Sequence, residues 1–147
     1  MTSKDSKARF IEPMLLQTTS DLPEGPAWGY ELKLDGYRAI AFKTHGRIHL
    51  RSRNNKDFSR KYPGIAEALA DLPDETVIDG EVVALDESGR PSFNLLQNYG
   101  SSNLPVFYYV FDVLILAGHD VMPEPLARRR DLLQQHILPK LKDPLRE

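Results

Sequence analysis

Residues 30–38 read Tyr30-Glu31-Leu32-Lys33-Leu34-Asp35-Gly36-Tyr37-Arg38. The pattern predicts a strand, in which successive side chains point to opposite faces. Glu31, Lys33 and Asp35 then lie on one face, and the apolar residues between them lie on the other. Strands are depleted in lysine, aspartate and glycine, so a charged face of this kind indicates a functional site.

Further strands are predicted along the chain after this stretch. Residues 36–43 and 47–53 alternate apolar and polar side chains around Thr44-His45-Gly46, which predicts a hairpin. Residues 76–85 predict a strand that is interrupted at Asp79-Gly80-Glu81. Residues 105–116 are strongly apolar, which predicts a central strand buried on both faces.

Helices are predicted at residues 59–72, 92–99 and 125–138. In the last of these, Leu126, Leu133 and Ile137 form an apolar stripe, and the arginines at 128–130 are expected to face outward. Residues 1–9 are polar, and we expect them to form a flexible tail.

Composition limits the function classes. The chain has 147 residues, which predicts one domain or part of one, and its net charge of -2 argues against nucleic-acid binding through bulk charge alone. It has no cysteine, so disulfides and cysteine-ligated zinc are excluded. No apolar run approaches about 18 residues, so no membrane span is predicted. A cytoplasmic location is expected.

Several charged residues permit two interpretations. Lys33 is either a nucleophile, whose pKa the site must lower, or a lysine paired with its acidic neighbours. Asp79 and Glu81 share a strand face, where they either hold a ribose hydroxyl or Mg²⁺ or lie solvated on a bulge. Asp112, within the apolar run, requires a partner such as Arg38, Lys33 or a helix N-terminus.

Two further features also permit two interpretations. Phe111 is expected to point away from Asp112, and it either stacks on a base or belongs to the core. A basic group follows the lysine segment, and it either binds phosphate or is a solvated hairpin face. Its members are Arg38, Arg51, Arg53, Lys56 and Arg60.

Taken together, these segments resemble the adenylation (nucleotidyltransferase) domain of ATP-dependent DNA ligases, and most nearly the ligase module of bacterial non-homologous end-joining ligases. The family's K-x-D-G-x-R, S-R-N, D-G-E and F-D-x-L motifs are similar, in order, to residues 33–38, 52–54, 79–81 and 111–114. The family's E-G-x-x-x-K motif and OB-fold domain have no counterpart. We therefore expect residues 10–147 to be the N-terminal part of an adenylation domain.

The resemblance implies an α+β fold of antiparallel sheets with flanking helices. It also implies that Lys33 attacks the α-phosphorus of ATP to form lysyl-AMP, for joining DNA breaks in repair and recombination. Mg²⁺ would assist, with no metal ligand assigned. The remaining roles are adenine recognition by Glu31, sugar contact by Arg38, phosphate or DNA contact by Arg53, ribose binding by Glu81, adenine stacking by Phe111, and pocket organisation by Asp35 and Asp79.

The same resemblance implies partners and leaves alternatives open. ATP and nicked or broken double-stranded DNA are the expected partners. We expect the chain alone not to seal nicks, and we expect either self-association or pairing with a missing C-terminal half. The alternatives are an RNA ligase or capping-type nucleotidyltransferase, which share K-x-D-G, and a non-catalytic nucleotide- or DNA-binding remnant.

Overall fold

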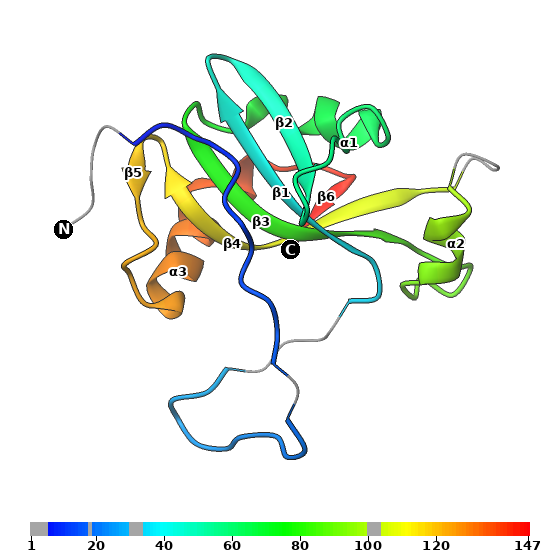
Figure 1. Ribbon diagram of the computed structural model, residues 1–147, viewed down its shortest axis with the longest axis horizontal. Coiled ribbons are helices and arrows are strands. Elements are labelled where there is room, and N and C mark those ends of the chain that lie inside the picture. Colours follow the sequence, from blue (N-terminus) through cyan, green and yellow to red (C-terminus); the bar gives the residue numbers. More distant parts are fainter. Residues whose placement is uncertain (1–5, 18, 30–33, 100–103) are drawn as a thin grey trace.

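The computed structural model describes residues 6–17, 19–29, 34–99 and 104–147. These residues form one sheet with strand order β2-β1-β3-β4-β5, and β6 pairs with β4 (Figure 1). The strands are β1 (Tyr37–Thr44), β2 (Arg47–Ser52), β3 (Thr76–Ala84), β4 (Val106–Leu116), β5 (His119–Asp120) and β6 (Leu145–Arg146). All pairs are antiparallel except β4 with β6. The predicted α+β class with an antiparallel sheet is confirmed.

The helices lie against one face of this sheet. They are α1 (Pro63–Ala68), α2 (Phe93–Gln97) and α3 (Leu126–His136), with short 3-10 segments at Leu69–Asp71 and Leu138–Lys140. The larger core forms between these segments and alternate residues of the strands, which include Ala39, Ala41, Ile78, Val82 and Val110. None of the described helices is long and apolar enough to cross a membrane.

The N-terminal residues cover part of the opposite face. Residues 6–16, which we call the N-terminal strap, cross the sheet (Figure 1), and Phe10 and Ile11 pack against a second, smaller core with Ile40 and Ile115. Ser6 N–H donates to the Gly118 carbonyl at 3.0 Å. The part of the predicted tail that the structure describes, residues 6–9, is therefore tied to the sheet.

The predicted hairpin is confirmed as β1 and β2. His45 and Gly46 both have positive φ, at 52° and 74°. This is the geometry of a type I′ turn, whose twist matches that of the flanking strands. Helix α1 is shorter than predicted, because the chain tightens into a 3-10 turn at Leu69. Pro63 lies in its first turn, where its missing N–H costs no helical hydrogen bond.

Part of the predicted strand at residues 30–38 is wrong. Residues 30–33 lie outside the described part of the chain, and Asp35 and Gly36 form a bend before β1 begins at Tyr37. A Cβ at Gly36 would lie 2.0 Å from the Val82 carbonyl oxygen, so β3 approaches the bend too closely for any side chain. Asp35 Oδ2 accepts the N–H of Phe93 at 3.2 Å, which ties the bend to the start of α2.

Strand β4 also differs from its prediction, because it is not buried on both faces. Its pairing with β3 matches Asp79 with Asp112 and Gly80 with Val110, which leaves Phe111 without an opposite residue. A second irregularity leaves Leu114 unmatched between Val113 and Ile115. A β-bulge of this kind turns two consecutive side chains to the same side. Partly exposed residues of β4 lie between its buried ones, and two of them, Phe111 and Asp112, are consecutive at the bulge, whereas β3 is the most buried strand.

Residues 139–147 follow the last helix that the sequence predicts. They form a 3-10 turn, a cis Asp143–Pro144 bond and the short strand β6, which pairs with Tyr108 and Tyr109 of β4. Arg146 lies over the ring of Phe107, with its guanidinium carbon 3.9 Å from the ring centroid. The segment thus covers one end of the β4 edge.

Candidate functional site

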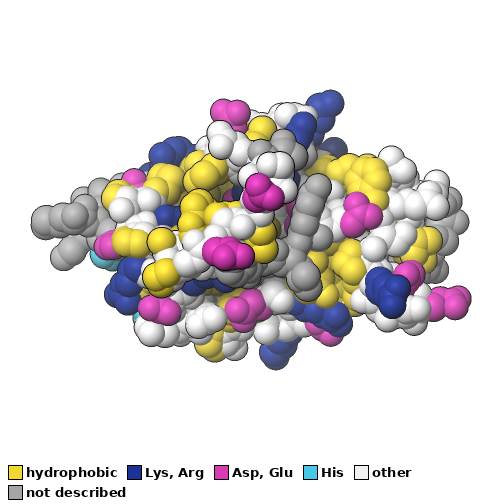
Figure 2. Space-filling model, turned by 90° about the horizontal axis from the view of Figure 1, so that it is seen from below, with side chains coloured by type: hydrophobic (Ala, Val, Ile, Leu, Met, Phe, Trp, Pro, Cys, Tyr) yellow, Lys and Arg dark blue, Asp and Glu magenta, His cyan; other side chains and the backbone are white. Residues whose placement is uncertain are grey.

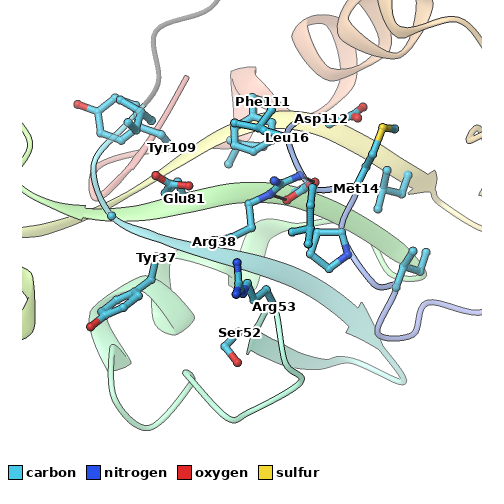
Figure 3. Close-up of a pocket in the computed structure, with 18 of the residues that line it drawn as sticks. Met14, Leu16, Tyr37, Arg38, Ser52, Arg53, Glu81, Tyr109, Phe111 and Asp112 are labelled. Atoms are coloured by element: carbon cyan, nitrogen blue, oxygen red, sulfur yellow. Dashed lines mark hydrogen bonds and ion pairs between the residues drawn. The ribbon is translucent and has the colours of Figure 1, made fainter. Parts of the chain in front are cut away.

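A broad, open pocket with a volume of about 1860 Å³ lies over β1, β3 and β4. Six predicted site residues from the described part of the chain line it, together with Asp112: Asp35, Arg38, Arg53, Asp79, Glu81 and Phe111. Figure 3 shows Arg38 at its centre, with Arg53 to one side and Phe111 to the other. Residues from four separate motifs therefore meet in one place, as the resemblance implies.

Arg38 and Asp79 form a two-pronged ion pair across β1 and β3. Arg38 Nε donates to Asp79 Oδ1 at 2.7 Å, and Nη2 donates to Oδ2 at 2.6 Å. The side chains are only 16% and 5% exposed, so water screens this pair weakly. Burial raises the pKa of the Asp79 carboxyl, and the Arg38 guanidinium opposes that rise. Asp79 thus fixes the direction of Arg38, as a pocket-organising residue should.

Phe111 is the extra residue of the β4 bulge and faces the pocket. The Arg38 guanidinium carbon lies 5.0 Å from its ring centroid, within the range of a cation–π contact. The prediction that Phe111 and Asp112 point to opposite faces is wrong, because the bulge brings both side chains to the pocket. Phe111 is only partly buried, which leaves ring surface for a planar ligand.

Asp112 has a partner that the sequence did not suggest. Arg129 of α3 donates through Nε to Asp112 Oδ1 at 2.9 Å and through Nη2 to Oδ2 at 3.1 Å. Its Nη1 donates to the Glu124 carbonyl at 2.7 Å, so all three guanidinium nitrogens are engaged. The side chains of Asp112 and Arg129 are 14% and 13% exposed. Hydrogen bonding to Asp112 raises the pKa of Arg129.

The expectation that all three arginines at 128–130 face outward is therefore wrong for Arg129. A periodicity signal was available, because Arg129 precedes Leu133 and Ile137 by four and eight residues. Positions four apart lie on one helix face, and Leu133 and Ile137 are buried. Asp112, a carboxylate in an apolar strand, also indicated that a positively charged side chain must lie nearby. Arg128, by contrast, is exposed.

The other predicted residues have simpler surroundings. Glu81 lies opposite Arg38 in the β1–β3 register, and its side chain is directed to the pocket on the same face of β3 as Asp79 (Figure 3). Arg53 is exposed in the turn after β2 and lines the rim with Lys56. The rest of the basic group is directed elsewhere. Arg51 binds Asn55, and Arg60 is 95% exposed beside Asp57.

Two predicted residues cannot be placed. Lys33 and Glu31 lie outside the described residues. The described residues of the same K-x-D-G-x-R segment, from Leu34 to Arg38, all line the pocket.

The sequence reasoning missed the contribution of the N-terminal strap to the pocket. Met14 and Leu16 line it, although both side chains are 79% exposed. The apolar character of residues 10–16 was a signal that this segment docks, but not where. Other exposed hydrophobic residues include Leu22 and Trp28. Figure 2 shows hydrophobic side chains interspersed with acidic and basic ones on the face seen from below Figure 1.

Among the described residues, no group of three or more histidines, cysteines or carboxylates is placed to hold an ion. The carboxylates that line the pocket wall include those of Asp35, Asp79, Glu81 and Asp112, and arginines engage Asp79 and Asp112. Mg²⁺ often takes one or two carboxylates together with substrate phosphates, and the pocket offers that donor set.

Comparisons with known proteins agree with this geometry. Residues 13–145 match the family model described as "ATP dependent DNA ligase domain". The chain is 36% identical over 146 residues to the multifunctional non-homologous end joining protein LigD of Pseudomonas aeruginosa, covering 97% of this chain and 17% of that protein. It is 33% identical over 127 residues to the SPbeta prophage-derived DNA ligase-like protein LigB of Bacillus subtilis, covering 84% and 46%.

A solved structure of a DNA ligase also resembles this chain. The fold is similar to that of mycobacterial DNA ligase D complexed with ATP and MES, with a TM-score of 0.62 and 40% identity. The similarity covers 71% of this chain and 35% of that one. The chain thus spans less than half the length of these relatives. From the match over residues 13–145 and from these relatives, we conclude that the chain belongs to the ATP-dependent DNA ligase domain family, within its adenylation domain.

Proposed function

We propose that this chain binds ATP and accepts AMP on Lys33, the first half-reaction of an ATP-dependent DNA ligase. The observation that carries the proposal is the convergence of Arg38, Glu81 and Phe111 on one pocket from three different strands. Lys33 itself lies outside the described residues, but the residues that follow it in its motif line that pocket.

The pocket supplies a distinct contact for each part of the nucleotide. The exposed ring surface of Phe111 offers a stacking platform for the adenine. Arg38 and Glu81 lie opposite one another on β1 and β3, where they are suited to the sugar and its hydroxyls. Arg53, at the rim, offers its guanidinium to a phosphate. Glu31 is proposed to contact the adenine amino group.

The chemical step is a displacement at the α-phosphorus. The Lys33 amine must lose its proton before it can attack, which a nearby positive charge or desolvation would favour. The new P–N bond forms as the bond to pyrophosphate breaks, and pyrophosphate leaves. Asp35 and Glu81 are the pocket carboxylates that would hold Mg²⁺, which would neutralise charge on the phosphates. Asp35 holds the start of α2 in place and Asp79 holds Arg38.

The complete reaction on DNA extends beyond this pocket. AMP would pass from Lys33 to a 5′-phosphate at a nick or double-strand break, and the adjacent 3′-hydroxyl would displace it. We propose this role in DNA repair and recombination in the cytoplasm. We expect sealing to require a further polypeptide segment or a second copy of the chain, and purified chain that seals a nicked duplex would contradict this.

The direct test is covalent labelling. Purified chain is incubated with Mg²⁺ and ATP labelled at the α-phosphate, and acid-labile label on the protein is measured. We expect label on the wild type and on Lys142→Ala, a control at an exposed lysine, and none on Lys33→Ala. Absence of label on the wild type favours a non-catalytic nucleotide-binding remnant. Label from GTP in place of ATP favours a capping-type nucleotidyltransferase.

A further inference from the structure

The two strands at the centre of the pocket place two carboxylates directly opposite one another. Asp79 of β3 and Asp112 of β4 are register partners, and both side chains are largely removed from water. Like charges directly opposite on neighbouring strands destabilise a sheet. Each carboxylate is neutralised by its own arginine, Asp79 by Arg38 and Asp112 by Arg129.

The two arginines have different tasks, because only one of them contacts Phe111. Arg38 lies over the Phe111 ring while it grips Asp79. Arg129 reaches from α3 to the residue next to Phe111 in the bulge and also binds the Glu124 carbonyl at the start of that helix region. A bulge is a local departure from the ladder, so side-chain contacts of this kind hold its geometry.

Without Arg129, Asp112 would be a carboxylate without a counter-ion, directly opposite Asp79 and its partner Arg38. A buried charge that loses its partner must find another or be exposed to water. Arg38 lines the same pocket and already binds Asp79, the register partner of Asp112. Competition for Arg38 would then disturb both the Arg38–Asp79 pair and the Phe111 ring.

We propose that Arg129 is a positioning residue of the nucleotide pocket: by binding Asp112 it fixes the β4 bulge that presents Phe111 and leaves Arg38 to Asp79. The link to nucleotide binding rests on the function proposed above. Arg129 acts through Asp112, to which it donates two hydrogen bonds.

The test follows the Phe111 ring by NMR in protein carrying ¹³C-labelled phenylalanine, with its signals identified by Phe111→Leu. The chain has six phenylalanines, so the other five report on the rest of the fold. In Arg129→Gln we expect the Phe111 signals to move, with the signals of Phe58 and Phe93 unchanged. Arg128→Gln, at the exposed neighbour on the same helix, is the matched control and should move none.

A second readout connects the ring to the nucleotide. Equilibrium ATP affinity should fall about tenfold in Arg129→Gln, since small misplacements of a binding group have effects of that size or larger. Adding Asp112→Asn removes the competing carboxylate, and the double variant should recover part of both the Phe111 signal position and the ATP affinity. A purely structural role of Arg129 predicts no such recovery.

The outcomes separate this proposal from the proposed function. Unmoved Phe111 signals in folded Arg129→Gln overturn the positioning role, whatever ATP does. If Arg129→Gln does not fold, Arg129→Lys, which keeps the charge without the paired hydrogen bonds, is read in the same way. If the wild type binds no ATP, the proposed function fails, and the Phe111 signals still decide the role of Arg129.

Discussion

Gly80 lies between Asp79 and Glu81, at the point where two strands and one tyrosine ring come closest. A Cβ at this position would lie 2.3 Å from the Tyr109 carbonyl oxygen and 2.7 Å from Cε1 of Tyr108. The Tyr108 hydroxyl donates to the Ala39 carbonyl at 2.9 Å, so this ring cannot move aside without losing a buried hydrogen bond. The packing of the sheet therefore requires the glycine of the D-G-E motif, whereas Asp79 and Glu81 on either side of it line the pocket.

Replacing this glycine should destabilise the protein. We expect Gly80→Ala to lower the free energy of unfolding by about 2–3 kcal/mol, as overpacking does in a well-packed interior. Gly64 in α1 is the matched control, because a Cβ there meets nothing within 4 Å. Gly64→Ala should be neutral or stabilising by about 0.5 kcal/mol. Urea denaturation measures both, and equal effects of the two substitutions would contradict the packing argument.

Individual residues were predicted from sequence to very different degrees. The same-face placement of Asp79 and Glu81 on β3 followed from strand alternation alone, and it is confirmed. The orientation of Phe111 did not, because a bulge is a property of the pairing between β3 and β4 and has no signature in β4 alone. Arg129 was missed because its charge outweighed the helix periodicity that places it inward.

At the scale of elements, one carboxylate joins the N-terminal strap to the β1–β2 turn. Glu75, in the turn before β3, accepts the Ala8 N–H at 2.7 Å and the Thr44 hydroxyl at 2.9 Å, and the His45 N–H at 3.3 Å. The strap and the β1–β2 turn thus share one acceptor. Glu75 accepts these hydrogen bonds most strongly when its carboxylate is ionised.

Docking of the strap should therefore depend on pH. Partial burial acts to raise the pKa of Glu75, but the hydrogen bonds from Ala8, Thr44 and His45 outweigh it and lower the pKa below the ordinary value. The stabilisation is then present above the unfolded pKa of about 4.3 and is lost as the pH falls through the lower folded value. We expect protection of the Ala8 amide against hydrogen exchange, corrected for intrinsic rates, to fall in that range.

Substitution of Glu75 separates its effect on the strap from the effects of the other acidic residues. At pH 6, Glu75→Gln should reduce Ala8 protection, whereas Glu67→Gln, at an exposed position of α1, should not. Below the folded pKa the wild type and Glu75→Gln should converge. Protection that is the same in both proteins at pH 6 would show that Glu75 does not hold the strap.

Element types were more predictable than element contacts. The β1–β2 hairpin, β3, α2 and α3 follow from alternation, turn residues and helix periodicity, all of which are local. The ends of β1 and β6 depended on distant partners instead. Val82 sets the bend at Gly36, and the edge of β4 orders residues 145–146, and neither influence can be read from the neighbouring sequence.

For the whole molecule, the pocket is the main route by which a ligand can affect stability. The described wall gathers residues from the strap, from the four strands β1 to β4, and from α2 and α3, so a ligand bound there can contact several elements at once. A ligand that binds only the folded state stabilises it by mass action. The size of that effect therefore reports directly on binding.

ATP should raise the thermal midpoint measurably. At a hundredfold excess over its Kd the gain is about 2.7 kcal/mol, or roughly 5–10 °C for a domain of this size. Phe111→Leu should show a smaller gain at the same ATP concentration, because base stacking contributes about 1–3 kcal/mol. Phe107→Leu, on the same strand but beside Arg146, is the control and should keep the full gain. An undiminished gain in Phe111→Leu would argue against stacking.

The attachment of the strap also bears on the order in which the chain folds. Ala8 finds its acceptor 67 residues later at Glu75, and Ser6 finds its acceptor at Gly118, beyond the end of β4. Contacts between such distant residues close long loops and form late. Synthesis proceeds from the N-terminus, so these residues leave the ribosome before the strands that receive them. The strap is thus made before the sheet and fixed after it.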